Sequence, residues 1–408
     1  MHFGKFRVPE NNLFDHEEVK RGDVESQFSK AKYFAEGTFE LPPTEHAFME
    51  VESALAMPYE DGVYVITGGQ GIYDEYNEIS EYLGIPREKV RIHSAYVGGG
   101  FGGKEDMSVQ HQAALCAYLT KRPVKVSFTR QESINYHPKR HAMKIYAKIA
   151  CDENGKFLAL KARLTSDTGA YASLGGPVLQ RACTHMGGPY NYQNVDIEGN
   201  AYYTNNPPAG AFRGFGVTQS VAVIECLINE LAQKTGLSGW EIRHRNAIRP
   251  GEVLPNGQIA DEGTAMAETL EALKEEYYRY ENDPNYYVGI SCAMKNSGIG
   301  VGLKDTGRCN LKIKDEKVYI RSSAADMGQG IQTVLMEIVA YTTGLTTDKL
   351  IVEHPDTEYT PDSGTTTASR QTVFAGEAAR IASAQLKEDL DKGFTLSDLN
   401  EKEYKGEF

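Results

Sequence analysis

The sequence predicts an α+β fold, in which strand hairpins and separate helices occur along one chain. Two runs of alternating residues, 141–151 and 157–167, are joined by a segment containing Asn154-Gly155, and Asn-Gly between such runs is typical of a hairpin. In 218–235, by contrast, apolar residues recur at helical spacing. Hairpins combined with independent helices are typical of α+β proteins.

The remaining elements follow in order along the chain. We expect strands at 63–67, 90–97, 123–128 and 318–323, and helices at 73–83, 105–119, 265–281, 329–343 and 376–390. Gly84 and Pro86 end the helix at 73–83. The 408 residues are enough for two or three domains. We predict a linker or tail at 1–30, a first domain at 31–282 and the start of a second, truncated domain at 283–408.

The composition argues against several classes of function. The net charge is −13 and no basic cluster is larger than a pair such as Lys139-Arg140, so nucleic-acid binding is not expected. The six cysteines form no C-x-x-C pair, so neither a zinc ribbon nor an iron–sulfur cluster is expected in this chain. No apolar run approaches the roughly 18 residues that cross a bilayer. We therefore expect a soluble, cytoplasmic chain with reduced thiols and no membrane partner.

Four segments share one local design, a turn rich in glycine or hydroxyl side chains that leads into a helix. They are Gly-Gly-Gly-Phe-Gly-Gly-Lys-Glu at 98–105, Ala-Phe-Arg-Gly-Phe-Gly at 211–216, Asp-Met-Gly-Gln-Gly at 326–330 and Asp-Ser-Gly-Thr-Thr-Thr-Ala-Ser-Arg at 362–370. Helix N-termini present free N–H groups and partial positive charge, so they bind anionic oxygens. Four such turns indicate a ligand with several anionic or oxo groups, such as a dinucleotide that carries a metal dithiolene. The alternative is that they are tight packing turns.

The first of these segments also matches a dinucleotide-binding fingerprint. Gly98-x-Gly100-x-x-Gly103 follows a predicted strand and precedes a predicted helix, as that fingerprint requires. The next strand should end in an acidic residue for the ribose, but Arg130 stands there instead. Arginine would suit a 2′-phosphate, so a nicotinamide or flavin oxidoreductase remains an alternative. The bulky Phe101 argues against it, because its ring would keep the backbone away from a pyrophosphate.

In their order along the chain, the segments at 98–105, 211–216 and 327–330 resemble the molybdopterin subunit of molybdenum hydroxylases, the family of xanthine dehydrogenases, aldehyde oxidoreductases and nicotinate dehydrogenases. The segment at 362–370 is most similar to the bacterial selenium-dependent branch, and the resemblance extends from about residue 22 onward. It implies two mixed α/β molybdopterin-binding domains, incomplete at both ends. It also implies a molybdenum–molybdopterin cofactor, in its cytosine dinucleotide form, with a selenido ligand as one variant.

The resemblance implies the reaction as well. Such an enzyme hydroxylates a purine-like N-heterocycle or an aldehyde with water as the oxygen source, and its electrons leave through iron–sulfur and FAD subunits. The family's catalytic glutamate lies in a late Gly-x-Gly-Glu motif that this chain does not contain. We therefore expect a downstream molybdopterin-domain polypeptide to supply the base, and the isolated chain to be inactive. The alternative is a fragment that folds without binding the cofactor.

The resemblance assigns roles to single residues. Gln70 corresponds to the glutamine that hydrogen-bonds the apical oxo ligand of molybdenum. Backbone neighbours of the metal, none of them a direct side-chain ligand, are implied at Phe101, Gly102, Arg213 and Ala368. Contacts to the pterin and its nucleotide are implied at Gln329, Thr367, Ala368, Ser369 and Arg370.

The remaining roles concern the substrate. Glu105 and Arg181 match a pair that orients the substrate, and Phe215 matches a ring that packs against it. Val301 and Gly302 stand where a second sandwiching aromatic is expected, which implies a wider pocket on that side. Without the resemblance, these residues have simpler explanations. Glu105 would be a helix N-terminal charge, Arg181 a surface ion-pair partner and Phe215 a core aromatic.

Overall fold

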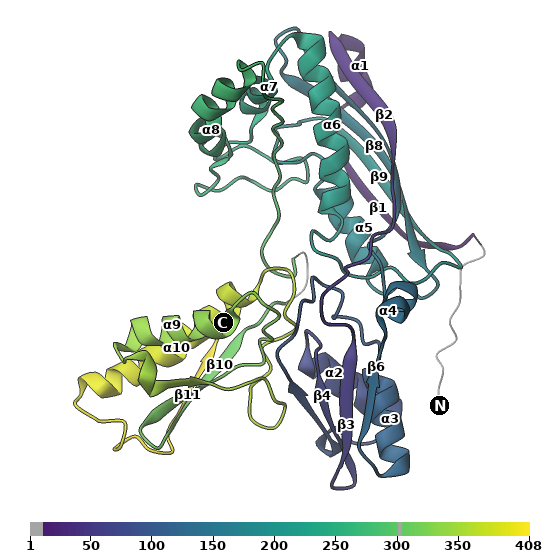
Figure 1. Cartoon of the computed structure of the whole chain (residues 1–408). Coiled ribbons are helices and arrows are strands. Elements are labelled where there is room, and N and C mark those ends of the chain that lie inside the picture. The colour runs from purple at the N-terminus through teal and green to yellow at the C-terminus, as the bar shows by residue number, and fades with distance from the viewer. Residues whose placement is uncertain (1–10, 301–303) are drawn as a thin grey trace. The chain divides into compact units, whose positions relative to one another are not determined.

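The computed structural model describes residues 11–300 and 304–408 (Figure 1). The chain divides into two compact units, each assembled from two separate stretches. The first unit comprises the residues up to 45 together with 138–295, and the second comprises 46–137 together with 296–408. The units are therefore interleaved along the chain, whereas the sequence suggested two successive domains at 31–282 and 283–408. Local patterns locate elements, but they do not show which distant strands share a sheet.

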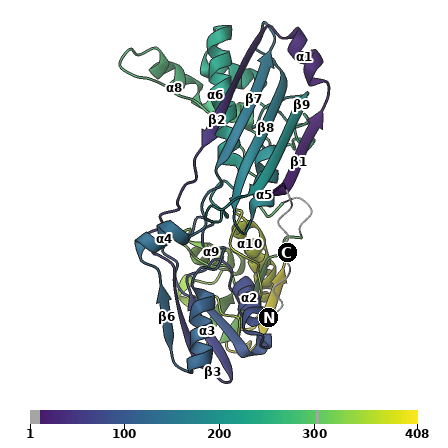
Figure 2. The same cartoon turned by 90° about the vertical axis from the view of Figure 1, so that its right-hand side faces the viewer.

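The first unit is built on a five-stranded sheet. In spatial order its strands are β1 (Leu13–Arg21), β9 (Val195–Tyr203), β8 (Phe157–Gly169), β7 (Met143–Cys151) and β2 (Tyr33–Leu41). Strands β8 and β9 are parallel, and the other neighbours are antiparallel. Figure 2 shows these strands side by side. Helices α5 (Gly175–Thr184) and α6 (Val217–Thr235) pack on the sheet and complete its apolar core.

Smaller helices complete this unit: α1 (Val24–Lys30) contacts β8, and α7 (Gly239–Asn246) packs against α6 and α8 (Met266–Glu281). The predicted hairpin is confirmed as β7 and β8, which pair from Met143 opposite Ser166 to Cys151 opposite Phe157. Its turn is closed by Asp152, whose carboxylate accepts hydrogen bonds from the N–H groups of Asn154 (2.9 Å) and Lys156 (2.8 Å).

The expected tail at 1–30 is wrong for its described part, because residues 13–30 form β1 and α1. Strand β1 pairs with β9 along its whole length, from Leu13 to Arg21. It lies at the edge of the sheet, and none of its residues is fully buried. An edge strand can carry many charged side chains, so its composition resembles that of a linker.

The second unit contains two four-stranded sheets. The first sheet has the order β5 (Val90–Ser94), β4 (Gly62–Thr67), β3 (Ser53–Tyr59) and β6 (Val124–Ser127). The second has the order β12 (Leu350–Val352), β11 (Lys317–Arg321), β10 (Arg308–Lys314) and β13 (Glu403–Glu407). Helices α2 (Ile72–Leu83) and α3 (Gln110–Thr120) pack on the first sheet, and α9 (Ile331–Thr343) and α10 (Gln371–Asp391) pack on the second. The short helices are α4 (Arg130–Tyr136), η1 (Arg87–Lys89) and η2 (Thr347–Lys349).

Two predicted helices begin at other residues. Helix α3 begins at Gln110, five residues after Glu105, because 98–105 is an extended loop of its own. Helix α10 begins at Gln371, before the predicted start at Gly376. Gly376 lies inside the helix because a Cβ there would be 2.9 Å from the side chain of Ile338 on α9. The glycine therefore marks close helix packing, not a helix end.

The sheet order contradicts the nicotinamide or flavin alternative. A dinucleotide-binding unit needs two adjacent parallel strands joined through the glycine loop and a helix. Here β5 pairs with β4, whereas β6, the strand after the loop and helix, pairs antiparallel with β3 at the opposite edge. The fingerprint at 98–103 is therefore not part of such a unit.

The segment after β12 joins the two sheets of the second unit. The Ser94 N–H donates to the Pro355 carbonyl (2.9 Å), and the Thr357 N–H donates to the Ile92 carbonyl (3.0 Å). Between them lies Asp356, which is 1% exposed. Its carboxylate accepts hydrogen bonds from Arg91 Nε (3.0 Å) and Nη2 (2.9 Å). A buried carboxylate that keeps its charge needs such a partner, so this pair fixes the segment against β5.

None of the helices within the described ranges is both long and apolar enough to cross a membrane.

We expect Asp356→Asn to lower the free energy of unfolding by about 3 kcal/mol, because the Arg91 guanidinium loses the charge of its buried partner. Urea denaturation of the purified chain measures this. The matched control is Glu377→Gln, which breaks the pair with Arg380 on a helix surface, where a change below about 1 kcal/mol is expected. Equal effects of the two substitutions would contradict the role given to Asp356.

Candidate functional site

Gln70 lies in the short turn between β4 and α2, and it is 1% exposed. Its side-chain Oε1 accepts hydrogen bonds from the N–H groups of Gly102 (3.0 Å) and Lys104 (3.3 Å). Its Nε2 donates to the Thr366 carbonyl (2.8 Å). The backbone repeats this pattern, since Gln70 N–H donates to Lys104 O (2.9 Å) and Thr366 N–H donates to Gln70 O (2.9 Å). One buried amide thus connects the loop at 98–105 with the loop at 362–370.

The loop at 98–105 approaches Gln70 through glycine. A Cβ on Gly100 would lie 2.5 Å from Gln70 Oε1 and 3.0 Å from Met327 Sδ. The non-glycine Phe101 has a φ of 54°, and Gly102 has a φ of 95°. Left-handed backbone at a non-glycine residue costs energy, so the surrounding contacts must hold it.

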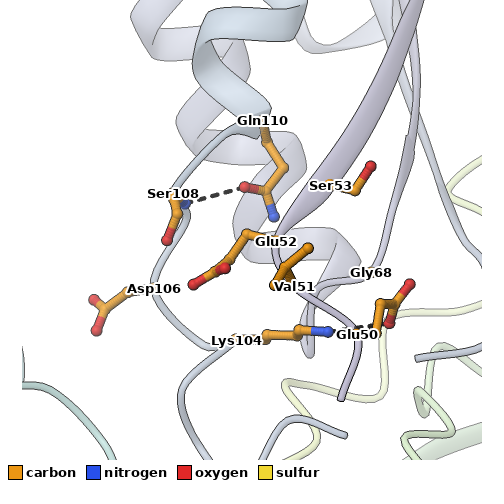
Figure 3. Close-up of a pocket in the computed structure, with 9 residues that line it drawn as sticks. All are labelled: Glu50, Val51, Glu52, Ser53, Gly68, Lys104, Asp106, Ser108 and Gln110. Atoms are coloured by element: carbon orange, nitrogen blue, oxygen red, sulfur yellow. Dashed lines mark hydrogen bonds and ion pairs between the residues drawn. The ribbon is translucent and has the colours of Figure 1, made fainter. Parts of the chain in front are cut away.

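Glu50 fastens both ends of this loop (Figure 3). Its Oε2 accepts hydrogen bonds from the Gly98 N–H (2.5 Å) and from Lys104 Nζ (3.0 Å). The Lys104 side chain is buried, and burial lowers the pKa of Lys104 although Glu50 opposes the shift. Behind the loop is a small polar pocket, lined by Glu50, Val51, Glu52, Ser53, Gly68, Lys104, Asp106, Ser108 and Gln110. No pattern in the sequence pointed to Glu50, because nothing in its neighbourhood forms a motif.

The turn at 326–330 joins the same group of loops. The Ala325 N–H donates to Thr366 Oγ1 (2.8 Å), and the Val97 N–H donates to the Asp326 carbonyl (3.2 Å). The Gln329 amide closes its own turn, since it donates to Ala325 O (2.8 Å) and accepts from Met327 N–H (2.7 Å). The structure therefore brings together three of the four predicted segments, and Gln70 with them.

Arg370 shapes the loop at 362–370 from inside. Its guanidinium is 1% exposed and donates to Asp305 Oδ1 (2.5 Å), Ser363 O (2.5 Å) and Thr306 O (2.6 Å). The side chain predicted to contact the cofactor is therefore engaged within the protein. The two preceding residues, Ala368 and Ser369, have φ values of 47° and 54°. The Gly298 N–H donates to the Ala368 carbonyl (3.0 Å), and Arg370 anchors the same loop at Ser363.

Glu105 ends the glycine loop and contacts the loop at 362–370. The Thr367 hydroxyl donates to Glu105 Oε1 at 2.5 Å. Burial raises the pKa of Glu105 to about 8, with smaller contributions from the charges of Asp106 and Asp74, and the Thr367 hydrogen bond opposes the shift. At neutral pH this carboxyl group therefore carries a proton and can donate a hydrogen bond as well as accept one.

Three predicted site residues belong to the first unit. Arg181 lies half-buried in the last turn of α5. The Arg213 carbonyl accepts a hydrogen bond from Arg140 Nη2 (3.0 Å), and the Arg140 guanidinium lies 3.9 Å from the centre of the Phe212 ring. Phe215 is partly buried against the core of this unit and has a φ of 51°. The segment at 211–216 is therefore another strained loop, and Arg140 is a support that the sequence did not single out.

The last two predicted site residues, Val301 and Gly302, lie outside the described residues.

Glu75 lies against the turn that contains Gln70, and no pattern in the sequence indicated this residue. The carboxyl is 3% exposed, and its Oε1 accepts hydrogen bonds from Thr67 Oγ1 (3.2 Å) and Gln110 Nε2 (3.3 Å). A Cβ on Gly69 would overlap this oxygen, which explains a glycine directly before Gln70. Burial raises the pKa of Glu75 to about 8.

This pKa predicts how stability depends on pH. The folded-state pKa of Glu75 lies above the usual 4.5, so the folded chain keeps a proton that the unfolded chain releases. The wild-type protein therefore loses stability as pH rises from about 5 to about 8. Glu75→Gln keeps the neutral form and should be more stable than wild type by on the order of 3 kcal/mol at pH 7, and by less than about 1 kcal/mol at pH 5.

Urea denaturation at pH 5, 6, 7 and 8 measures the difference between Glu75→Gln and wild type. The exposed Glu81→Gln on the same helix is the control, with changes below about 0.5 kcal/mol expected throughout. A Glu75→Gln difference that does not grow with pH would show that Glu75 is ionised in the folded protein.

Comparisons with known proteins identify this architecture. Residues 5–247 and residues 265–405 each match a family described as a molybdopterin cofactor-binding domain. Among curated proteins, the chain is 34% identical over 376 residues to a probable xanthine dehydrogenase subunit of Bacillus subtilis, with 90% of this chain and 50% of that protein covered. It is 37% identical over 267 residues to the nicotinate dehydrogenase large molybdopterin subunit of Eubacterium barkeri, with 65% of this chain and 63% of that protein covered.

Solved structures agree with these matches. The aldehyde oxidoreductase from Desulfovibrio gigas superposes with a TM-score of 0.91 at 26% identity, over 97% of this chain and 46% of that one. The quinoline 2-oxidoreductase from Pseudomonas putida 86 superposes with a TM-score of 0.86 at 25% identity, over 92% of this chain and 51% of that one. This chain spans between half and two thirds of the length of the two curated relatives.

Proposed function

The chain belongs to the molybdopterin cofactor-binding family of molybdenum hydroxylases, as its motifs predicted, and on this premise we propose that it is the cofactor-binding part of an enzyme that hydroxylates an N-heterocycle or an aldehyde with water as the oxygen source. The observation that carries the proposal is the Gln70 amide, which joins two strained glycine- and hydroxyl-rich loops through three hydrogen bonds. A scaffold that fixes such loops suits the binding of a ligand with many oxygens.

The residues of the second unit fit a molybdopterin cofactor. Within the described residues, the backbone N–H groups of Phe101, Ala368 and Ser369 have no hydrogen-bond acceptor, and all three residues have left-handed φ values. Such N–H groups are suited to oxo, sulfur and phosphate groups. In this proposal the cofactor supplies the redox centre that accepts two electrons from the substrate. The residues of this unit that would hold it are Gln70, Phe101, Gly102, Gln329, Thr367, Ala368, Ser369 and Arg370, the last through the loop that its side chain shapes. Arg213 of the first unit is the further residue that we propose for the cofactor.

Glu105 and Arg181 would orient the substrate, and Phe215 would pack against its ring. The proton that Glu105 retains at neutral pH allows it to donate a hydrogen bond to a ring nitrogen or oxygen. Arg181 would stabilise negative charge that develops on the substrate. We further propose the cytosine dinucleotide form of the cofactor, a selenido ligand as a variant to be tested by selenium analysis, and a cytoplasmic location.

We also propose partner polypeptides. A molybdopterin-domain polypeptide would supply the general base, and iron–sulfur and FAD subunits would carry the electrons away. The similarity to a subunit named as a large molybdopterin subunit supports such a division of labour.

Metal analysis tests this function. We expect molybdenum to co-purify with the chain in complex with its partner polypeptides, and hydroxylase turnover only in that complex. Robust turnover of the isolated chain would refute the division between polypeptides. Absence of molybdenum from both preparations would support a fragment that does not bind the cofactor.

Gly100→Ala tests the close approach of the glycine loop to Gln70. The added methyl group meets Gln70 Oε1 and Met327 Sδ, so we expect the molybdenum content of the complex to fall by roughly tenfold or more, as for other residues that support a metal site. Gly289→Ala is the control, because a Cβ there meets nothing within 4 Å. Unchanged molybdenum in Gly100→Ala would remove the loop from the cofactor site.

A further inference from the structure

Helix α4 is short, and hydrogen bonds fix both of its ends. At its start, Thr129 Oγ1 accepts from the Glu132 N–H (3.2 Å), and Glu132 Oε2 accepts from the Thr129 N–H (2.7 Å). At its end, the His137 N–H donates to the Ser133 carbonyl (3.1 Å). A reciprocal cap of this kind stabilises a helix that is too short to be stable by itself. The helix therefore presents the His137 side chain at a defined place.

The His137 ring lies against the glycine loop. The ring is buried, and its Nε2 donates to the Gly103 carbonyl oxygen at 2.6 Å. Because a carbonyl oxygen only accepts, Nε2 carries a hydrogen in this contact. A Cβ on Gly103 would be 2.7 Å from His137 Cε1 and 2.9 Å from His46 Cδ2. The glycine therefore allows the ring to approach the backbone closely enough for this hydrogen bond.

Glu52 favours the form of the ring that donates. Its side chain is buried, and its Oε1 lies 3.6 Å from His137 Nε2 and accepts a hydrogen bond from Ser133 Oγ (3.4 Å). The Phe128 N–H donates to the Glu52 carbonyl (3.0 Å), which fixes the backbone at this residue. An acceptor oxygen beside one ring nitrogen favours the hydrogen on that nitrogen. Glu52 thus supports the hydrogen bond from His137 to Gly103.

The peptide between Gly103 and Lys104 is held from both sides. Its carbonyl accepts from His137, and its N–H donates to Gln70 Oε1 (3.3 Å). The unit is planar and trans, so its carbonyl and its N–H point in opposite directions, and fixing one fixes the other. A hydrogen bond to the carbonyl also polarises the peptide, which strengthens donation by its N–H. His137 therefore acts on Gln70 through this one peptide.

We propose that His137, supported by Glu52, is a positioning residue that orients the Gln70 amide toward the cofactor. The inference rests on the proposed function, in which Gln70 holds the cofactor. The Lys104 N–H holds the amide oxygen, and Nε2 donates one hydrogen to the Thr366 carbonyl. A side-chain amide has two donor hydrogens on its nitrogen, and in this proposal the second donates to the cofactor.

The experiment compares His137→Phe, which keeps a ring but removes the donor, with His137→Gln, whose side-chain N–H replaces Nε2. The first readout is hydrogen exchange of the Lys104 amide in the full chain, measured by NMR after labelling with 15N-lysine. We expect His137→Phe to speed this exchange about tenfold, as for the loss of one buried hydrogen bond, and His137→Gln to restore the wild-type rate. Glu52→Leu should speed the exchange by about threefold, because it weakens the bond without removing it.

The second readout is turnover per bound molybdenum in the complex with the partner polypeptides. We expect kcat to fall about tenfold in His137→Phe while KM changes less than about twofold, because His137 acts on a residue that holds the cofactor and not on the substrate. His137→Gln should restore kcat. His111→Phe is the matched control, since His111 is a partly exposed histidine of the same unit beside Glu78. It should leave both readouts unchanged.

Unchanged Lys104 exchange in His137→Phe would overturn the inference. Equal rates in His137→Phe and His137→Gln would overturn it as well, since the ring shape and not the donor would then matter. Faster exchange with wild-type turnover per molybdenum would show that the oriented amide does not serve the cofactor. The proposed function fails separately, through absence of molybdenum from the wild-type complex, and the exchange rates then still decide whether His137 orients the peptide.

Discussion

The buried Gln70 amide is the constraint on which the second unit's site depends. Its hydrogen bonds join the glycine loop that follows β5 to a hydroxyl-rich loop whose Thr366 lies 296 residues after Gln70. An amide is suited to this task because it accepts and donates at once without carrying charge. A buried amide without these partners would be costly, so the hydrogen bonds fix the positions of both loops.

The loops around Gln70 contain few side chains that could pack, and polar and charged side chains hold them instead. Glu50 and Lys104 close the glycine loop, Arg370 and Asp305 shape the loop at 362–370, and Asp356 and Arg91 fasten the two sheets. Each of these pairs joins charges of opposite sign, and in each pair at least one member is buried, so that it needs its partner. The left-handed backbone at Phe101, Ala368 and Ser369 is thereby maintained against its intrinsic cost.

Burial also sets the chemistry of two carboxyl groups beside Gln70. Glu75 and Glu105 both have pKa values raised to about 8, so both are neutral at pH 7. The first is enclosed and supports the turn, whereas the second lies next to the predicted cofactor loops.

The sequence by itself determined the family, most secondary elements and the three loops that meet around Gln70, because short glycine motifs and helical or alternating periodicity are local. The tail predicted at residues 1–30 was wrong for the described part, because the charged edge strand β1 has the composition of a linker. It did not reveal the interleaved units or the sheet order that excludes a dinucleotide fold, because strand pairing between distant segments leaves no local pattern. Only the tertiary structure identified Glu50, Glu75 and Arg140. Each is an ordinary charged residue in the sequence, and its role comes from burial and from neighbours that are far away along the chain.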